Sequence, residues 1–515
     1  MNTTAVTVFG LFVILTLYIS VQASRRSRTA EGFYAAEGQF GGFLNGVAIT
    51  GDFLSAATFL GITGLLFSAG LDTAFYLIAP LLGLSIMLFT MAGPFRRLGR
   101  FTLADVVSYR LQNKPVRLFS AITSLVIVVF YLIVQFVGAG KLMQGLFGID
   151  FKAAVLVAGG LTMIYVAVGG MIATTWVQVI KATLLLASFV IITLMILYRF
   201  GFSLPEMYGT VADKAPLGER LFEHGNLYKD WFSILSFCVA IPLGMAGMPH
   251  ILMRLFTVPN ARQANLSVFW ATFFIGTTMV LMLLVIGYGA AAILPDYAEF
   301  YADGEIIGGS NMVALHLSQA LGGSVFFGFV STVVFATILA VVCGLILAGA
   351  SAFSHDLYAH VIRGGKSEEQ EEVRVTRIAT IVLGGIGILL AIAFEDQNIA
   401  YMATLAFAVS ASTNFPILIL SLYWRNLTTR GLVIGGSMGL LSTVALLVLG
   451  PTVWVDVLGN AEAVFPYKYP ALITSPLAFA TIYVVSRFDR SDRALRDREG
   501  FDEQCAIAFG TGYSA

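Results

Sequence analysis

The sequence predicts an all-α polytopic membrane protein with about 13 transmembrane helices. Of the 515 residues, 58% are hydrophobic and only 12% are charged, and the mean hydropathy is +0.85. Soluble proteins are about 25% charged, so this chain carries too little charge to solvate a soluble surface. The formal net charge is zero, which leaves no basic field for phosphate. The composition therefore excludes a soluble enzyme, a disordered chain and a nucleic-acid binder.

A second observation is a series of apolar stretches that are long enough to cross a bilayer, which takes about 20 residues. The first stretch lacks a basic start and precedes Arg25, Arg26 and Arg28, so we expect a retained span rather than a secretory signal. In chain order the stretches cover residues 5–23, 42–70, 73–94, 117–145, 152–170, 175–199, 231–256, 265–294, 324–353, 374–394, 398–423, 428–450 and 466–486.

A third observation is the distribution of lysine and arginine, which favour cytoplasmic loops. Most of the basic residues between spans fall in alternate loops, near Arg96, Arg254, Arg363 and Arg425, and in the tail after residue 487. The pattern predicts an N-terminus outside the cell and a cytoplasmic C-terminus, which requires an odd number of spans.

Two of the spans have the composition of interrupted helices. The second, GGFLNGVAITGDFLSAATFLGITGLLFSAG (41–70), is rich in Gly, Ser and Thr. The seventh, FCVAIPLGMAGMPHILMRLF (237–256), contains Pro242 and Pro249, and proline removes a backbone donor and kinks a helix. Symporters often place their binding sites at such interruptions in matching positions of two inverted repeats. The alternative is that small residues merely allow close helix packing.

The two interrupted spans lie five apart and run in opposite directions in the predicted topology, which favours two five-helix inverted repeats. We therefore expect an extra N-terminal helix and basic inner loop in 1–30, a first repeat in 42–199, an inverted second repeat in 231–423, two C-terminal helices in 428–486 and a cytoplasmic tail in 487–515.

Four polar residues inside the spans are candidates for a structural or a functional role. An acid at mid-bilayer costs about 2.5–3.5 kcal/mol, so Asp52 is either a cation ligand or proton carrier, or an acid that caps a half-helix. Lys141 either snorkels to the interface, or forms a salt bridge or steers an anion. We expect Gln135 to hydrogen-bond between helices, and His250 to be a hydrogen-bonded structural residue rather than a proton shuttle.

Interrupted helices also supply candidate substrate ligands, because half-helix N-termini present N–H groups to a carboxylate. The polar run before Pro416 either lines a cavity or forms hydrogen bonds between helices. It consists of Ser410, Ser412, Thr413 and Asn414. His355 and Asp356 lack an accompanying nucleophile, and the sequence has no P-loop, so we expect neither catalysis nor ATP-driven transport. The candidate substrate ligands are Thr50, Thr58, Gly247, Ser412 and Asn414.

At these residues the sequence resembles the sodium:solute symporter family, and within it the acetate permease (cation/acetate symporter) branch. The similarity runs from about residue 30 to the tail. The matching stretches are GDFLSAATFLGI (51–62), LGRFTLADVVSYRL (98–111), VGAGKLMQGLFG (137–148), GGMIATTWVQVIKA (169–182), PHILMRLFTV (249–258), FATILAVVCGLILAGASAFSHDLY (335–358) and FPYKYPAL (465–472).

The resemblance implies a LeuT-like transporter core without an enzymatic step. The expected function is secondary active symport of acetate or another short monocarboxylate with a cation, in a bacterial cell (inner) membrane. The expected partners are the monocarboxylate, the coupling cation and the lipid bilayer, and a small membrane partner subunit is compatible with this organisation. No cofactor is implied beyond Na⁺ or H⁺ as the coupling ion.

The resemblance also places a cation site at the first interruption. When the family pattern is aligned with this sequence at Gly61, its two backbone carbonyl ligands fall on Gly51 and Leu54. When it is aligned at Asp52 instead, they fall on Thr50 and Phe53. A family aspartate falls on Gln178, where this chain has a neutral amide.

The hydroxyl ligands of the family site fall on Ala340 and Val341, which offer no side-chain oxygen. The resemblance therefore implies a weakened or relocated site, with substitute oxygens from Asp52, Ser55 and Thr337. Alternatively Asp52 carries a proton, as a desolvated acid does. The sequence leaves the coupling ion open between Na⁺ and H⁺.

Three other functions remain as alternatives, and the inverted repeat and the midplane acid disfavour one of them, a channel. The first is a symporter of the same fold for a different small solute, such as a sugar, proline or a vitamin. The second is a carboxylate sensor that does not transport. We expect a sensor to carry a cytoplasmic signalling domain, which the short tail does not provide.

Overall fold

The computed structural model describes residues 38–168 and 171–510, together with Thr7, Gly10, Leu11 and Ile14. The expected N-terminal helix and basic loop in 1–30 lie mostly outside the described residues. Within the described chain the structure is almost entirely helical. Its one sheet pairs strand β1 (Tyr301–Ala302) with strand β2 (Glu305–Ile306) in an antiparallel hairpin.

Helices cover each of the other twelve expected spans. The helices of the first half are α3 (Gly42–Phe53), η2 (Ala57–Ile62), α4 (Thr63–Ala69), η3 (Gly70–Thr73), α5 (Ala74–Ile86), η4 (Met87–Met91), α6 (Ala92–Leu98), α7 (Leu103–Val107), α8 (Asn113–Phe147), α9 (Phe151–Val168), α10 (Met171–Arg199), α11 (Leu204–Lys214) and η5 (Gly218–Phe222). Those of the second half are α12 (Trp231–Ala246), α13 (Pro249–Met253), η6 (Arg254–Phe256), α14 (Ala261–Leu281), η7 (Met282–Ile286), α15 (Gly287–Ile293), η8 (Leu294–Asp296), η9 (Ala298–Phe300), η10 (Ser310–Met312), α16 (Val313–Ser351), η11 (Ala352–Ile362), α17 (Glu369–Ala393), α18 (Ile399–Ser412), α19 (Asn414–Tyr423), α20 (Thr429–Val448), η12 (Pro451–Val457), α21 (Ala471–Phe488), α22 (Asp492–Glu499) and α23 (Phe501–Phe509).

Both spans that the sequence marks as interrupted are broken. Helix α3 ends at Phe53, the next residue has a non-helical ψ of 84°, and the chain resumes as the π-helix η2. Helix α12 ends at Ala246, and α13 begins at Pro249. A residue before proline is pushed away from the helical region, and Met248 accordingly has a ψ of 120°. A further break separates α18 from α19 at Thr413, where φ is −123° and ψ is −76°.

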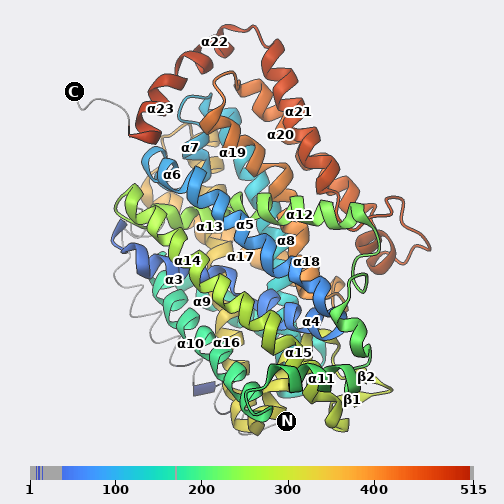
Figure 1. Cartoon of the computed structure of the whole chain (residues 1–515). Helices are drawn as coiled ribbons and strands as arrows, with labels where there is room; N and C mark the ends of the chain where they lie inside the picture. The colour runs from blue at the N-terminus through green and yellow to red at the C-terminus, as the bar shows by residue number, and fades with distance from the viewer. Residues whose placement is uncertain (1–6, 8–9, 12–13, 15–37, 169–170, 511–515) are drawn as a thin grey trace.

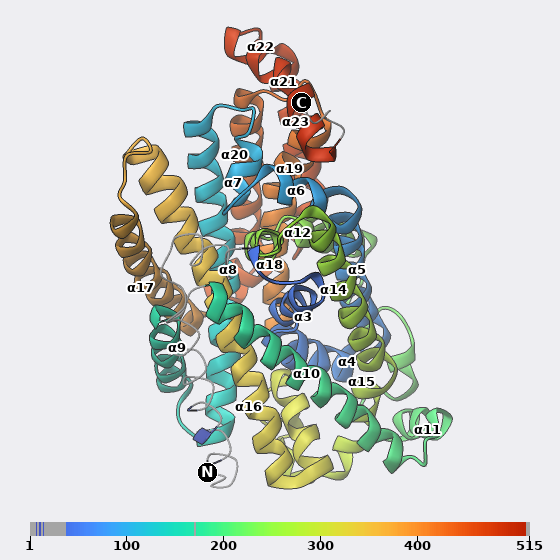
Figure 2. The same cartoon turned by 90° about the vertical axis from the view of Figure 1, so that its left-hand side faces the viewer.

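The broken helices lie in the middle of the bundle. Helix α3 packs on α14 and α10, and α12 packs on α18 and α5. Helix α16 runs through the centre of the bundle. In its span 94% of the most apolar 18-residue stretch is buried, against 39% of the corresponding stretch in the peripheral α17. Figures 1 and 2 show α7, α22 and α23 at one end, here called the α7 end, and α11 at the other, where Figure 1 also shows the β1–β2 hairpin.

Two glycines explain how the broken helices approach α18 so closely. A Cβ atom at Gly61 would lie 2.4 Å from the backbone nitrogen of Ala400, and one at Gly244 would lie 2.2 Å from the carbonyl oxygen of Phe407. These distances leave no room for any side chain. The small residues of the interrupted spans therefore serve close packing as well as helix breaking.

Candidate functional site

Asp52 lies on the last turn of α3, beside the first break, and is completely buried. Its carboxylate forms an ion pair with Arg254, whose Nε lies 2.6 Å from Oδ2, and Gln178 donates a hydrogen bond to Oδ1. Arg254 belongs to η6, just after the second break. The acid of one broken helix is thus joined directly to the arginine of the other.

The position of Arg254 corrects an expectation. From the sequence we place it at the cytoplasmic end of the seventh span, with no arginine inside the membrane. In the structure only 1% of Arg254 is exposed, because the break before Pro249 redirects the chain toward α3. The side chain also donates to the Thr175 hydroxyl at 2.6 Å, and its carbonyl accepts from Asn45 at 2.9 Å.

Lys181 on α10 is a second fully buried cation, 1% exposed. Its Nζ donates to the carbonyl oxygen of Thr337 on α16 at 3.0 Å. One turn earlier, Gln178 donates to the carbonyl of Ala340 at 2.8 Å as well as to Asp52. Helix α10 therefore presents two donors to α16 at the place where the sequence predicts cation ligands, and the Thr337 hydroxyl donates to Val333 within its own helix.

The other predicted cation ligands line the end of α3. A Cβ atom at Gly51 would lie 2.8 Å from Oε1 of Gln178, so this turn is pressed against α10. In the alternative register, the carbonyl of Thr50 accepts from the backbone of Leu54 at 2.8 Å, and that of Phe53 accepts from the Thr58 hydroxyl at 3.1 Å. Ser55, in the break itself, is completely buried, and its hydroxyl interacts with the phenol of Tyr131.

A small cavity opens at the first break. Its volume is about 30 Å³, and its walls come from the broken helix, α5, α8, α12 and α18. The hydroxyls of Thr58, Tyr76, Tyr131 and Thr404 supply the polar groups. The remaining lining is apolar: Phe53, Ala57, Ile62, Pro80, Phe237, Ile241, Ala400, Ala403 and Phe407.

Among the five predicted substrate ligands, only Thr58 lines this cavity. The amide nitrogen of Asn414 donates to the carbonyl of Gly247 at 2.9 Å, and Ser412 shares a hydrogen bond with Thr474 at 2.7 Å. Thr50 donates to Gly46 within α3 at 2.9 Å. The polar run therefore bonds between helices, which is one of the two roles weighed from the sequence, and it ties the break after α18 to the second break.

Gln135 differs from the expectation based on the sequence. We expect an interhelical hydrogen bond, yet the amide is completely buried and neither of its polar atoms has a partner among the described residues. It lies one turn after the cavity residue Tyr131 and one turn before Gly138, where a Cβ atom would lie 2.7 Å from that of Ala56. Residues three and four apart share a helix face, so Gln135 faces the first break.

His250 and Lys141 also differ from the first-choice expectations. His250, at the second break, is 3% exposed and stacks on the ring of Tyr131 at 5.5 Å, and its Nδ1 has no hydrogen bond among the described residues. Lys141 is buried rather than snorkelling: its ammonium lies 3.7 Å from the carboxylate of Glu395 and 4.9 Å from the ring centre of Phe151.

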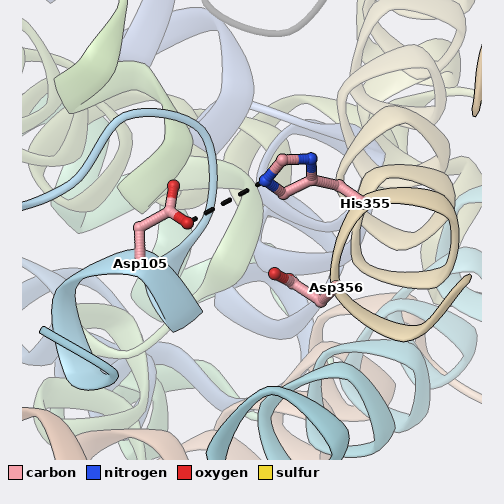
Figure 3. A group of neighbouring side chains, drawn as sticks. All are labelled: Asp105, His355 and Asp356. Carbon is pink, nitrogen blue, oxygen red and sulfur yellow. Dashed lines mark ion pairs between the residues drawn. The ribbon is translucent and has the colours of Figure 1, made fainter. Parts of the chain in front are cut away.

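A cluster of charges lies at the α7 end, where Asp105, His355 and Asp356 point toward one another from α7 and η11 (Figure 3). Arg117 of α8 bridges the two carboxylates, 2.7 Å from Asp105 and 2.5 Å from Asp356, and His355 contacts Glu372 of α17 at 2.9 Å. The arginine fills the place a metal ion would need, so the cluster is an ion-pair link among α7, α8, η11 and α17.

The ionisation of Asp105 follows from these contacts. Burial disfavours its charge, but Arg117, His355 and the backbone N–H groups of Phe101 and Thr102 outweigh burial, so the pKa of Asp105 lies below its ordinary value of 3.8. The same carboxylate completes a capping box with Thr102 at the start of α7. Asp105 therefore carries its full charge at neutral pH.

Comparison with known proteins gives one family and one fold. The model of the sodium:solute symporter family matches residues 33–439. A Na⁺-coupled sialic acid symporter in a substrate-bound outward-open state is similar, with a TM-score of 0.74, 16% identity, and coverage of 94% of this chain and 98% of that chain. Mhp1, a nucleobase-cation-symport-1 family transporter in a closed conformation with bromovinylhydantoin bound, has a TM-score of 0.52, 13% identity, and coverage of 92% and 99%. The fold is thus the all-α, LeuT-like fold of these transporters.

Proposed function

This chain belongs to the sodium:solute symporter family, and from that premise we propose that it takes up acetate or another short monocarboxylate together with sodium. Family membership makes it a multi-pass membrane protein and a sodium-coupled solute symporter rather than an enzyme. The substrate is the part that has to be argued from the residues.

The observation that carries the proposal is the cavity at the first break. A cavity of about 30 Å³ with mostly aromatic and aliphatic walls suits a solute of a few heavy atoms that has an apolar end. A sugar would bring many hydroxyls, and each hydroxyl that is buried without a partner costs about 1–3 kcal/mol. The walls offer few polar partners, so a short monocarboxylate fits better than a polyol.

The polar end of such a solute has buried donors near it. The hydroxyl of Ser55 lies at the first break, and the amide of Gln135, which has no hydrogen-bond partner among the described residues, faces the same break. A carboxylate accepts hydrogen bonds, and an unpaired buried donor gains most from a charged acceptor. Neutralising the anion with a cation lowers the cost of burying it.

For the coupling cation we propose oxygen ligands from Gly51, Asp52, Leu54, Ser55 and Thr337. Sodium and the Lys181 ammonium are then alternatives at the Thr337 carbonyl, because that oxygen accepts from Lys181 at 3.0 Å. Two unit cations at 4 Å repel by about 4 kcal/mol at an effective dielectric constant of 20. Sodium entry therefore requires Lys181 to move away from Thr337.

The Asp52–Arg254 ion pair supports coupling between cation binding and rocking of the two broken helices. It joins the end of α3 to η6, so a cation that draws Asp52 toward itself changes the contact between the halves. Each net positive charge that moves inward gains about 2.3 kcal/mol per 100 mV of membrane potential.

We infer that the α7 end faces the cytoplasm. Arginines gather there, with Arg96 bonded to Val258, Arg97 to Ala508 and Arg425 to Asp502. Cytoplasmic loops carry the excess of arginine and lysine in membrane proteins. The proposed orientation places the C-terminal helices α22 and α23 inside the cell.

Uptake of ¹⁴C-acetate into proteoliposomes, with sodium and proton gradients imposed separately, tests the proposal. Protein-free liposomes control for leakage of acetic acid. We expect an inward sodium gradient at fixed pH to stimulate saturable uptake. Stimulation by a proton gradient alone would overturn sodium coupling and make Asp52 the candidate proton carrier. No uptake under either gradient would overturn the acetate assignment.

A further inference from the structure

We propose that the protein has a second anion site in an outer vestibule, where Lys229 and Lys468 hold a carboxylate before it enters the cavity at the first break. This inference rests on the proposed function, because it supplies the route by which a small carboxylate reaches that cavity. It concerns a stretch, FPYKYPAL (465–472), to which the transport site itself assigns no role.

The vestibule is a separate and much larger cavity of about 340 Å³. Its walls come from the loops before α12, before α18 and before α21, which contribute Lys229, Asn398 and Lys468 respectively. The charge distribution of the sequence predicts that all three loops lie outside the cell. A solute that arrives from outside would meet this cavity first.

The charge of the vestibule favours an anion. Lys229 and Lys468 are both exposed, and neither forms an ion pair within the described residues. The acid among the lining residues, Asp230, already caps α12, where it accepts from the backbone nitrogen and the hydroxyl of Ser233 at 2.8 Å each. Clefts with one excess sign of charge concentrate ions of the other sign.

Contacts with neighbouring residues hold the side chain and backbone of Lys468 in position. Its ammonium lies over the ring of Tyr401, 4.9 Å from the centroid. The next residue, Tyr469, is 3% exposed, and its carbonyl accepts from the Ser236 hydroxyl at 2.5 Å. An ordered ammonium loses less conformational entropy on binding an anion than a mobile one does.

A pair of tyrosines separates the vestibule from the inner cavity. The hydroxyls of Tyr76 and Tyr469 are hydrogen-bonded at 2.8 Å, and Tyr76 lines both cavities. A carboxylate at Lys468 is therefore one side chain away from the transport cavity. The vestibule selects by charge and the inner cavity by size, so a bulky carboxylate such as benzoate should bind in the vestibule without being carried through.

The first test is the kinetics of acetate uptake at low ionic strength by the double variant Lys229→Gln/Lys468→Gln. We expect the KM for acetate to rise at least about fivefold with an unchanged maximal rate, since such steering changes local ion concentration tenfold or more, and the difference to shrink at high salt. Lys229→Arg/Lys468→Arg should keep the wild-type KM, and Lys152→Gln, an exposed lysine of another expected outer loop, should do the same. A KM within twofold of wild type in the Gln variant would overturn the inference.

The second test is equilibrium binding of ¹⁴C-benzoate to the purified full-length protein, with protein-free micelles as the control. We expect the wild-type protein to bind benzoate and the double Gln variant to lose most of this binding. Equal binding by both proteins, or none by wild type, would overturn the vestibular site. Failure of wild type to take up acetate would instead overturn the proposed function, and the benzoate comparison still decides the inference.

Discussion

The ammonium group of Lys181 donates a hydrogen bond to the carbonyl oxygen of Thr337, 3.0 Å away, in the fully buried centre of the bundle. A second buried cation, Arg254, pairs with Asp52 on the neighbouring broken helix. The region proposed for the coupling cation therefore already holds two protein cations and one acid. Any ion that binds there has to contend with this local positive charge.

Removal of the Lys181 charge should strengthen sodium binding. At an effective dielectric constant of 20, the repulsion between two cations at 4 Å is about 4 kcal/mol, and even a third of it amounts to about tenfold in affinity. We expect Lys181→Met and Lys181→Gln to lower the sodium concentration that gives half-maximal uptake by about tenfold, and Lys181→Arg to leave it near wild type. Sodium titration of uptake measures this. An unchanged midpoint in both neutral variants would show that Lys181 and sodium do not share a site.

The Asp52–Arg254 pair should behave as a unit. Breaking a buried ion pair from one side costs about 3–5 kcal/mol, because the remaining charge is left uncompensated. We expect Asp52→Asn and Arg254→Gln each to lower the melting temperature strongly, and the double variant to recover part of the loss. Fluorescence-detected gel filtration after heating measures all four proteins.

The same double variant separates folding from coupling. It removes the carboxylate oxygen proposed for the cation, so it should fold and still fail to show sodium-stimulated uptake. Strictly additive melting-temperature losses would contradict direct pairing, and normal sodium stimulation would contradict the role of Asp52 as a ligand.

The sequence predicts most of the fold because each main feature has a local cause. Apolar stretches of about 20 residues require spanning helices, and helices cover all twelve of the expected spans within the main described part of the chain. Pro249 restricts the residue before it, so the second break is readable from the sequence alone. The break at Leu54 contains no proline and is predicted by composition only.

The site is less predictable, because its main contacts join segments far apart in the chain. Asp52 stands out in the sequence, but its partner Arg254 reads as a loop arginine until the break at Pro249 turns it inward. Lys181 lies in a stretch that resembles the symporter family, and nothing in the neighbouring sequence marks it as buried. Gln135 has a polar side chain on an apolar helix, and only the packing around Gly138 shows which way it faces.

The charge of Asp105 at the α7 end should be insensitive to pH across the physiological range. The pKa of Asp105 is lowered in the folded protein, so its contribution to stability is present above the ordinary value of 3.8 and is lost only as pH falls through the lower folded value. We expect Asp105→Asn to lower stability by about 1.5–3 kcal/mol through loss of the charged hydrogen bond to Arg117. The loss in melting temperature relative to wild type should therefore persist at pH 5, where Asp105 is still charged.

A matched control is Asp502→Asn, which removes an exposed ion pair with Arg425. Exposed pairs contribute about 0–1 kcal/mol, so this variant should melt close to wild type. A difference for Asp105→Asn that disappears as pH falls to 5 would contradict the lowered pKa.

Replacement of Gln135 by an apolar residue should raise the stability of the protein and weaken transport. An amide buried without partners costs about 1–3 kcal/mol, so Gln135→Leu, which is similar in size and needs no partner, should raise the melting temperature. The same change removes a donor proposed for the carboxylate, so the KM for acetate should rise by about tenfold, equivalent to about 1.4 kcal/mol.

Thr123→Val is the control, because the Thr123 hydroxyl donates to Asn414 at 3.0 Å and lies among hydrogen bonds that are already satisfied. It should lower stability and leave the KM unchanged. A Gln135→Leu protein that is less stable than wild type would mean that the amide has a partner in the membrane, and an unchanged KM would remove Gln135 from the substrate site.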